Sequence, residues 1–202
     1  MKPIAIYGAG SFGRETLMLI RQINADKPRW EPVGFFDDNY PVGERIHDVP
    51  VIGDIHDLNA HEEGLYIVIA VGNPKVRKKI YNKIQNDLIS FATLIHPSVQ
   101  IEEFQHCSIG HGTIIAAGNI LTTDIHIGQH VLLNMACTCG HDVRIGDFAS
   151  IMPNCILSGE AEIGEECFIG AGAAIMNRVQ IEHGARVGAR ETVGLGLPKI
   201  MR

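Results

Sequence analysis

Apolar side chains recur at every sixth position over the second half of the chain. The series runs from Ile109 to Val193 through fifteen positions without a slip. Glycine follows directly at eight of these positions, and a small residue usually stands two places earlier. A sustained six-residue period is typical of a parallel β-helix, in which three hexapeptides form one triangular coil. The pattern therefore predicts five coils, with a height of roughly 24 Å at the usual strand spacing.

The first half of the chain shows a different pattern. An apolar run at 3–7 leads into a glycine-rich segment at 8–13, and a helical pattern follows. Further strands are predicted at 31–38 and 65–72, and the second leads into "NPKVRKKIYNKI", a helix with an early proline. This alternation predicts a parallel sheet with crossover helices. The fold class is thus a small Rossmann-like α/β domain over residues 1–95, followed by a parallel β-helix over 96–202.

The glycine-rich segment has the spacing G-x-G-x-x-G, formed by Gly8, Gly10 and Gly13. Such a turn lets a phosphate approach the backbone N–H groups at the start of a helix. Asp37 lies 24 residues beyond Gly13, near the place of a ribose-binding acid. The spacing alone is equally that of a plain tight turn. Because a dinucleotide fold needs two such halves, one half favours a nucleoside diphosphate over NAD.

Composition narrows the classes of partner. The formal net charge is −6, which argues against a nucleic-acid partner. No apolar run reaches membrane-spanning length, and the start of the chain lacks a signal-peptide pattern. Five cysteines in such a chain indicate reduced thiols, and we therefore expect a cytoplasmic protein.

The stretch "NMACTCGHDVRIGD" at 134–147 offers thiols, an imidazole and a carboxylate. The six-residue register places Cys139 on the inward aliphatic position and the other four cysteines on the small inward position. The five cysteines are therefore expected to pack in the core as small hydrophobes, and not to bind zinc or act as nucleophiles.

His141 stands two places after an inward position, so its side chain should point outward near a corner. Asp142 follows it directly. Residues 18 apart stack on one wall, which puts Gly159 one coil above His141 and Asn177 above that. A glycine there leaves room for a ligand and exposes an N–H group. Geometry alone leaves open a functional histidine or a solvated surface one.

At this point the chain resembles a known family. The segments "GHDVRIGDF", "LSGEAEIGEECFIGAGAAI" and "GLPKIMR", with "IYGAGSFGRE", "FFDD" and "AVGNPKVRKKIYNKI" before them, are similar to the NeuD-like sugar acetyltransferases. This family has left-handed parallel β-helices and includes sialic acid O-acetyltransferases and N-acetyltransferases of nucleotide-linked 4-amino sugars. The resemblance covers nearly the whole chain.

The resemblance implies an acetyl-CoA-dependent N-acetyltransferase. It would act on the amino group of a nucleotide-linked sugar, of the 4-amino-4,6-dideoxy type, in surface glycan biosynthesis. It implies a homotrimer with acetyl-CoA between neighbouring β-helices and no metal. His141 would be the general base and Asp142 the carboxylate that orients it. The other implied contacts are Ser150, Gly159, Ala171 and Ala189 with acetyl-CoA, and Gly10, Ser11, Phe12, Asp37, Asp38, Gly72 and Asn134 with the nucleotide sugar.

Two positions depart from the family pattern. Many relatives carry a histidine where this chain has Ser150, and another where it has Phe12. These changes affect the expected sugar and nucleotide more than the reaction class.

Among weaker indications, Lys199 could lie near the CoA phosphates and Arg77 could reach a phosphate, while the rest of the helix 75–83 is expected to face water. His130 and His183 are expected to be solvated.

Three alternatives stay open. A sugar hydroxyl acceptor would make the protein an O-acetyltransferase of the sialic acid type. A zinc-dependent hydratase would use histidines shared between subunits, although His111 and His126 fall at different points of the six-residue period. A non-catalytic nucleotide-sugar-binding protein would fit the changes at Phe12 and Ser150.

Overall fold

The N-terminal half is a six-stranded sheet flanked by helices. A computed structural model describes residues 1–194, and Lys199 lies outside them. The strand order is β3-β4-β2-β1-β5-β6, parallel throughout except for the β3–β4 hairpin at one edge. The elements are β1 (Lys2–Tyr7), α1 (Ser11–Asp26), β2 (Trp30–Phe36), β3 (Arg45–Ile46), β4 (Val49–Gly53), α2 (Ile55–Asn59), β5 (Leu65–Ile69), α3 (Pro74–Lys83) and β6 (Ile89–Phe91). The predicted strands and helices are all present, and the β3–β4 hairpin, α2 and β6 are additions.

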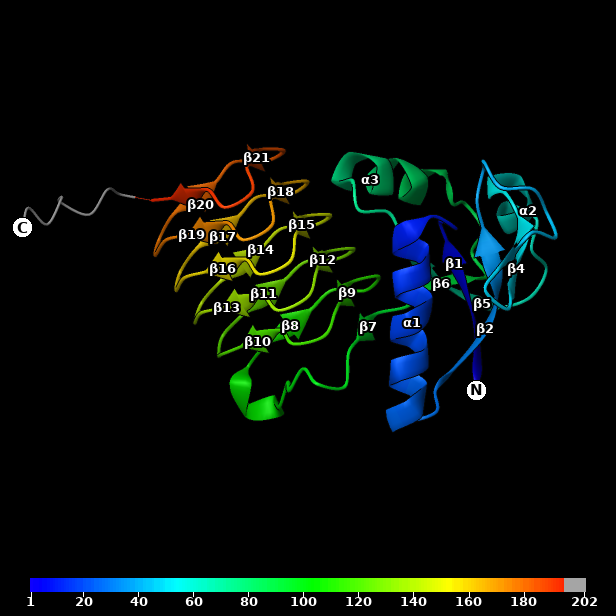
Figure 1. The fold of residues 1–202 in the computed structure, drawn as a ribbon, viewed down its shortest axis with the longest axis horizontal. Coiled ribbons are helices and arrows are strands. Elements are labelled where there is room, and N and C mark those ends of the chain that lie inside the picture. The colour runs from blue at the N-terminus through cyan, green and yellow to red at the C-terminus, as the bar shows by residue number, and fades with distance from the viewer. Residues whose placement is uncertain (195–202) are drawn as a thin grey trace, which may run out of the picture.

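Helix α1 lies between the sheet and the β-helix, as Figure 1 shows. Its buried Leu17 and Ile20 belong to a core cluster that also contains Ile4 of the sheet and Ile114 and Leu132 of the β-helix. One apolar core therefore joins the two halves, which holds the glycine-rich turn in a defined place beside the β-helix.

The C-terminal half is a left-handed parallel β-helix, as the resemblance implies. A 3-10 turn, η1 (Glu103–Gln105), precedes its coils, and fifteen two-residue strands follow. The first wall holds β8 (Ser108–Ile109), β11 (His126–Ile127), β14 (Arg144–Ile145), β17 (Glu162–Ile163) and β20 (Gln180–Ile181). The second holds β7 (Leu94–Ile95), β9 (Ile114–Ile115), β12 (Leu132–Leu133), β15 (Ser150–Ile151), β18 (Phe168–Ile169) and β21 (Arg186–Val187). The third holds β10 (Ile120–Leu121), β13 (Thr138–Cys139), β16 (Ile156–Leu157), β19 (Ala174–Ile175) and β22 (Thr192–Val193).

The corners of the prism repeat as regularly as the core. Every sixth residue from His106 to Arg190 has a left-handed backbone, with φ between 51° and 74°. Only four of these fifteen are glycines. The other eleven carry side chains in a conformation that costs energy locally, and the stacked backbone hydrogen bonds of neighbouring coils hold them there.

The cysteines pack as the register predicts. Cys137, Cys139, Cys155 and Cys167 are buried among the aliphatic side chains of the prism axis, and Cys107 packs against the same cluster. Burial raises the pKa of Cys139 to about 12, so this thiol stays protonated and unreactive at neutral pH. β7 pairs with β9, so the second wall already includes the last two residues of the predicted N-terminal segment.

Candidate active site

His141 lies at the corner where the third wall turns into the first. Its imidazole lies against Gly159, one coil further along, as the 18-residue register predicts. A β-carbon added at Gly159 would come within 2.5 Å of His141 Nε2 and 2.7 Å of Cε1. Only glycine at position 159 therefore leaves the imidazole its present place.

Asp142 orients this imidazole. Its Oδ2 lies 2.8 Å from His141 Nδ1, and both side chains are about half exposed, at 54% for His141 and 56% for Asp142. Asp142 occupies the left-handed corner position with φ 60°, which turns its carboxylate back toward the preceding residue. A carboxylate on Nδ1 favours the tautomer with its proton there, so the Nε2 lone pair is free to accept a proton.

The backbone around Gly159 adds a donor to the same place. The neighbouring amides bond along the wall, from Ser158 N to Ile175 O and from Glu160 N to His141 O. Within residues 1–194, no acceptor receives the N–H of Gly159 itself. A free backbone N–H beside an imidazole is the arrangement that stabilises an oxyanion formed at a carbonyl under attack.

Each of the three glycines in the glycine-rich turn has a different structural explanation. Gly8 has φ 111°, which only glycine adopts readily. At Gly13 a β-carbon would come within 1.9 Å of Gly8 O, so this glycine lets the helix approach the strand. At Gly10 a β-carbon would meet nothing within 4 Å, and φ is −71°. Within the described residues, no contact requires glycine at position 10. A glycine that the fold itself does not need is expected where a ligand comes close to the backbone.

The start of α1 is open to an anion. Gly10 precedes the helix and supplies no side-chain cap, so the first-turn N–H groups of Ser11, Phe12 and Gly13 lack intrahelical acceptors. The helix also carries no acidic residue in its first turn. A helix N-terminus of this kind favours a phosphate group.

Asp37 and Asp38 line a cavity of about 260 Å³ beside this turn, together with Gly8 and Lys83. Asp37 Oδ2 accepts from Ala9 N at 2.8 Å and so holds the glycine-rich turn, which is a contact that the sequence did not predict. Its Oδ1 accepts from Asn39 N at 2.9 Å.

Asp38 is held by Tyr7, Lys83 and the backbone N–H of Ile55, which donates to its Oδ1 at 3.2 Å. Its Oδ1 accepts from the Tyr7 hydroxyl at 2.5 Å, and Lys83 Nζ lies 3.6 Å from Oδ2. Burial and the neighbouring Asp38 carboxylate raise the pKa of Tyr7 above its ordinary value, so the hydroxyl remains a donor. The roles of Asp37 and Asp38 toward a base or ribose stay predictions.

Phe12 and Asn134, which lie far apart in the sequence, line one small pocket between α1 and the β-helix. Its other walls include Leu19, Ile114 and Met135, so it is mainly apolar. Asn134 Oδ1 accepts from Met135 N at 2.7 Å, which fixes the amide at the rim of this pocket. The docking of α1 on the β-helix thus brings together two of the predicted substrate-binding residues.

The predicted acetyl-CoA residues occupy more than one edge of the prism. Gly159 shares a corner with His141, whereas Ala171 and Ala189 are exposed and stacked at the corner between the second and third walls. There Ala171 O accepts from Arg190 N at 2.8 Å. The two edges do not meet within one chain.

Ser150 lies inside the contact between the two halves. It is 0% exposed, accepts from Arg77 Nη2 at 2.8 Å and donates to Gly72 O at 2.8 Å. Its hydroxyl is therefore already used within the chain. Its contact with acetyl-CoA stays a prediction that these hydrogen bonds do not favour.

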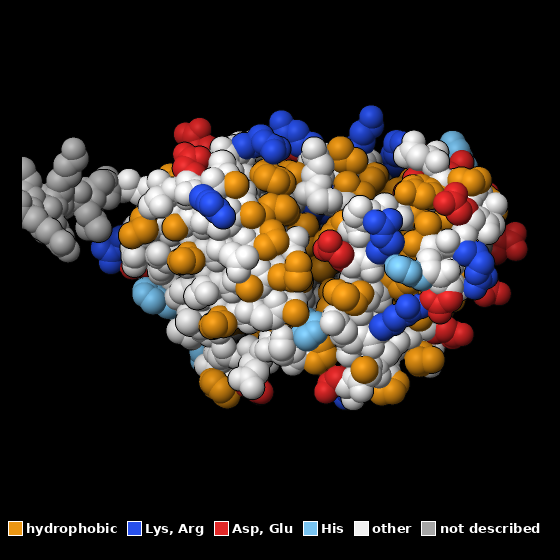
Figure 2. Space-filling view, viewed as in Figure 1, with side chains coloured by type: hydrophobic (Ala, Val, Ile, Leu, Met, Phe, Trp, Pro, Cys, Tyr) orange, Lys and Arg blue, Asp and Glu red, His pale blue; other side chains and the backbone are white. Residues whose placement is uncertain are grey.

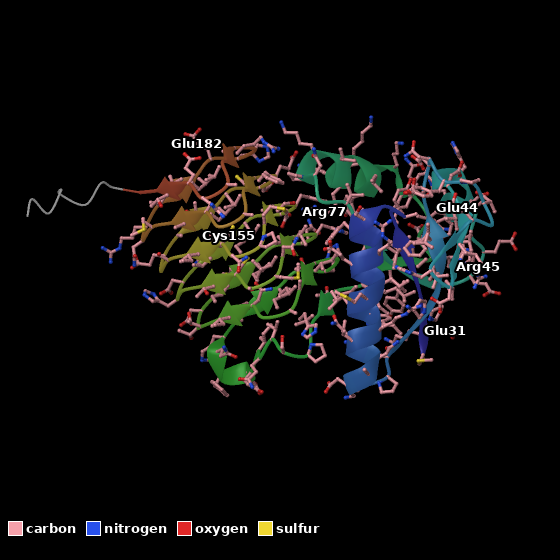
Figure 3. All side chains as sticks on the ribbon, viewed as in Figure 1. Glu31, Glu44, Arg45, Arg77, Cys155 and Glu182 are labelled. Carbon is pink, nitrogen blue, oxygen red and sulfur yellow. The ribbon has the colours of Figure 1, made fainter. Side chains whose placement is uncertain are left out.

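Arg77 is one of two residues that were expected at the surface and are buried. It is 2% exposed and faces the β-helix, so it cannot reach a phosphate in solution. Figure 3 shows its label where α3 meets the β-helix. Pro74, Arg77 and Ile80 are the buried residues of α3 and stand three apart, so the helical spacing could have revealed this face.

His130 is also buried, at 0% exposure, and the prediction of a solvated histidine is wrong. Its ring stacks on Phe148 with centroids 5.1 Å apart and lies among Tyr81 and Phe91. A ring enclosed in this way within one chain cannot be a zinc ligand shared between subunits, as the hydratase alternative would require of its histidines.

One group of possible metal ligands occurs elsewhere, where the side chains of Glu165, Glu166 and His183 gather. Lys78 Nζ already lies 2.5 Å from Glu166 Oε1 and 3.9 Å from Glu165 Oε2. The lysine thus neutralises much of this acidic group.

No helix within residues 1–194 is both long and apolar enough to cross a membrane.

Comparisons with known proteins agree with this architecture. Residues 3–84 match the family model of the PglD N-terminal domain, and residues 142–177 match that of the bacterial transferase hexapeptide (six repeats). A GDP-perosamine N-acetyltransferase from Escherichia coli O157:H7 is 28% identical over 179 residues, which cover 89% of this chain and 80% of that protein. In both halves the chain is similar to the NeuD-like sugar acetyltransferases.

Solved structures of sugar acetyltransferases superpose on both halves of the chain. PerB from Caulobacter crescentus, in complex with CoA and GDP-perosamine, is 27% identical with a TM-score of 0.84, over 98% of this chain and 91% of that one. The acetyltransferase domain of PglB from Neisseria gonorrhoeae FA1090, in complex with acetyl coenzyme A, is 29% identical with a TM-score of 0.81, over 94% and 89%. The predicted resemblance and the predicted fold class are thereby confirmed.

Proposed function

We propose that this protein is an acetyl-CoA-dependent N-acetyltransferase that acts on the amino group of a nucleotide-linked sugar. The observation that carries the proposal is the group formed by Asp142, His141 and Gly159, with an oriented imidazole beside a free backbone N–H. The GDP-perosamine and CoA bound to PerB, a structure that covers both halves of this chain, support the choice of substrates.

In the proposed reaction the neutral amine of the sugar attacks the thioester carbonyl carbon. A C–N bond forms, and His141 Nε2 accepts the proton that the amine nitrogen gives up. Asp142 stabilises the resulting imidazolium through Nδ1. The N–H of Gly159 donates to the carbonyl oxygen as it becomes an oxyanion. The C–S bond then breaks, and the CoA sulfur leaves and takes the proton to give the thiol.

The N-terminal half would hold the nucleotide. The open N-terminus of α1 at Ser11 and Phe12 suits the diphosphate, and the cavity beside Asp37 and Asp38 suits a ribose or base. If the protein acetylated the hydroxyl group of a free sugar, the N-terminal half would have no nucleotide to bind. We therefore favour N-acetylation of a nucleotide-linked amino sugar, of the 4-amino-4,6-dideoxy type, in surface glycan biosynthesis in the cytoplasm.

A homotrimer would complete the site. His141 and Gly159 lie on one edge of the prism and Ala171 and Ala189 on another, so these edges can face each other only between two copies. The third wall lies between them and exposes Ile120 and Ile156, at 59% and 51%. Figure 2 shows hydrophobic side chains spread over the face of the β-helical half that is turned to the viewer.

The decisive experiment is thiol release from acetyl-CoA with a panel of UDP-, dTDP- and GDP-linked 4-amino sugars. We expect turnover on one amino sugar and its loss in His141→Ala. Sugars with a hydroxyl in place of the amine form the second panel, and turnover on these alone would make the protein an O-acetyltransferase. Turnover that persists in His141→Ala would refute the assignment of the base. Binding of a nucleotide sugar without any turnover would favour the non-catalytic binding protein.

A further inference from the structure

A buried hydrogen-bond network connects the β-helix to the loop that follows β5. Arg77 of α3 donates from Nη1 to Val71 O at 2.5 Å, and so holds the first residues after the strand. Its Nε donates to His130 O at 2.9 Å and its Nη2 to Phe148 O at 2.7 Å, both at a corner of the β-helix. One guanidinium thus bonds to the backbone of both halves.

Ser150 closes this network from the side of the β-helix. It accepts from Arg77 Nη2 and donates to Gly72 O, both at 2.8 Å. The carbonyls of Val71 and Gly72 are consecutive, and the first bonds to Arg77 while the second bonds to Ser150. The conformation of this loop is therefore determined by a side chain of the β-helix as well as by α3.

The same loop lies against the glycine-rich turn. A β-carbon at Gly8 would come within 2.9 Å of Ala70 O and 3.4 Å of a Val71 side-chain carbon, so the two backbones are in close contact. Val71 also lines the cavity that contains Asp37 and Asp38. Contacts therefore run without a break from Ser150 through the loop 70–72 to the proposed nucleotide site.

Because the Arg77 guanidinium is buried, its positive charge must be compensated by protein groups at well-defined positions. All five described acceptors of Arg77 are neutral oxygens, four carbonyls and one hydroxyl. A buried cation held by oriented dipoles tolerates little displacement, because water cannot replace a lost partner. Figure 3 shows Arg77 where α3 meets the β-helix, and the residue is 2% exposed.

We infer that Ser150, with Arg77, is a positioning residue for nucleotide-sugar binding. It holds the loop 70–72 against the glycine-rich turn, and it acts through that loop without touching acetyl-CoA. This inference rests on the proposed function for its ligand.

The test uses Ser150→Ala in the full chain, with Ser108→Ala as the matched control. Ser108 also begins a strand of the β-helix but is exposed on the first wall. Hydrogen exchange of the amides of residues 70–76 is measured without ligand, and UDP, dTDP and GDP are titrated calorimetrically. We expect faster exchange at 70–76 and up to about tenfold weaker nucleotide binding in Ser150→Ala only, because the variant loses both the hydrogen bond to Gly72 O and the one from Arg77. The KM for acetyl-CoA should not change.

Wild-type exchange rates at residues 70–76 in Ser150→Ala would overturn the inference. So would a raised KM for acetyl-CoA with unchanged nucleotide affinity, because Ser150 would then act on the cofactor. If the wild-type protein binds none of the three nucleotides, the proposed function loses its nucleotide site. The exchange rates still decide in that case whether Ser150 positions the loop.

Discussion

The imidazole of His141 fills the space that a β-carbon at Gly159 would need, with Nε2 2.5 Å from that position. The two residues stand one coil apart, so this contact follows from the repeat itself. The contact places the proposed base, His141, directly beside the proposed oxyanion donor, the N–H of Gly159. A β-carbon at position 159 would therefore displace the imidazole from its present place.

Gly159→Ala should therefore abolish most activity while the fold stays intact. The new methyl group meets the tip of a half-exposed side chain, which can swing away at little cost in stability. The displaced imidazole would lose its alignment, and we expect kcat to fall by about 10²-fold or more. Steady-state kinetics and thermal unfolding test this together. Gly64→Ala is the control, because a β-carbon at Gly64 meets nothing within 4 Å.

Asp142→Asn should remove the negative charge beside His141 while it keeps the shape of the side chain and of the corner. Asparagine accepts the left-handed corner conformation readily, so the corner at φ 60° should form as before. The neutral amide no longer stabilises an imidazolium at His141 and can hold the wrong tautomer. We expect kcat to fall by about 10²-fold with little change in the KM values. Equal kcat in wild type and variant would mean that Asp142 does not assist the base.

Gly10→Ala should weaken nucleotide binding without affecting stability. A β-carbon there meets no protein atom within 4 Å, and φ of −71° suits alanine. A diphosphate at the start of α1 would, however, meet the added methyl group. We expect an unchanged midpoint of urea unfolding and a clearly raised Kd for the nucleotide. If the variant binds nucleotide as tightly as the wild-type protein, the phosphates do not lie at this turn.

Acid should destabilise the contact between the two halves through His130. Burial, with smaller effects of His111 and Arg77, lowers the pKa of His130 from 6.5 to about 3. The unfolded state therefore binds a proton below pH 6.5 that the folded state does not bind until about pH 3. Stability must fall as the pH falls through this window, by about 2 kcal/mol between pH 6.5 and 5.

The variant His130→Phe should lose this dependence. Phe148 has the same left-handed backbone one coil further along, with φ 58°, so the corner accepts phenylalanine. Urea unfolding of both proteins at pH 7 and pH 5 gives the measurement. The difference between the two pH values should be smaller in His130→Phe by about 2 kcal/mol. Identical differences in the two proteins would show that His130 is not the group that titrates.

The six-residue period was enough to predict the walls, the inward cysteines and the stacking of Gly159 on His141. A repeat translates each side chain by a fixed step, so residues 18 apart must meet. The period says nothing about what covers a wall from outside. Ser150, His130 and Arg77 have polar side chains that would suit a wet surface, and they are buried only because α3 lies on the second wall. Docking of the two halves depends on the shape of both, which no local pattern encodes.

The left-handed corner at every sixth residue also determines which changes of length the protein can accept. An insertion of 18 residues adds one whole turn of the prism and leaves every wall in register. An insertion of six residues would instead rotate everything beyond it by one face, and would carry Ala171 and Ala189 to a different edge. An insertion whose length is not a multiple of six would break the repeat. The β-helix can thus grow only in whole coils, and the spacing between its edges is conserved when it does.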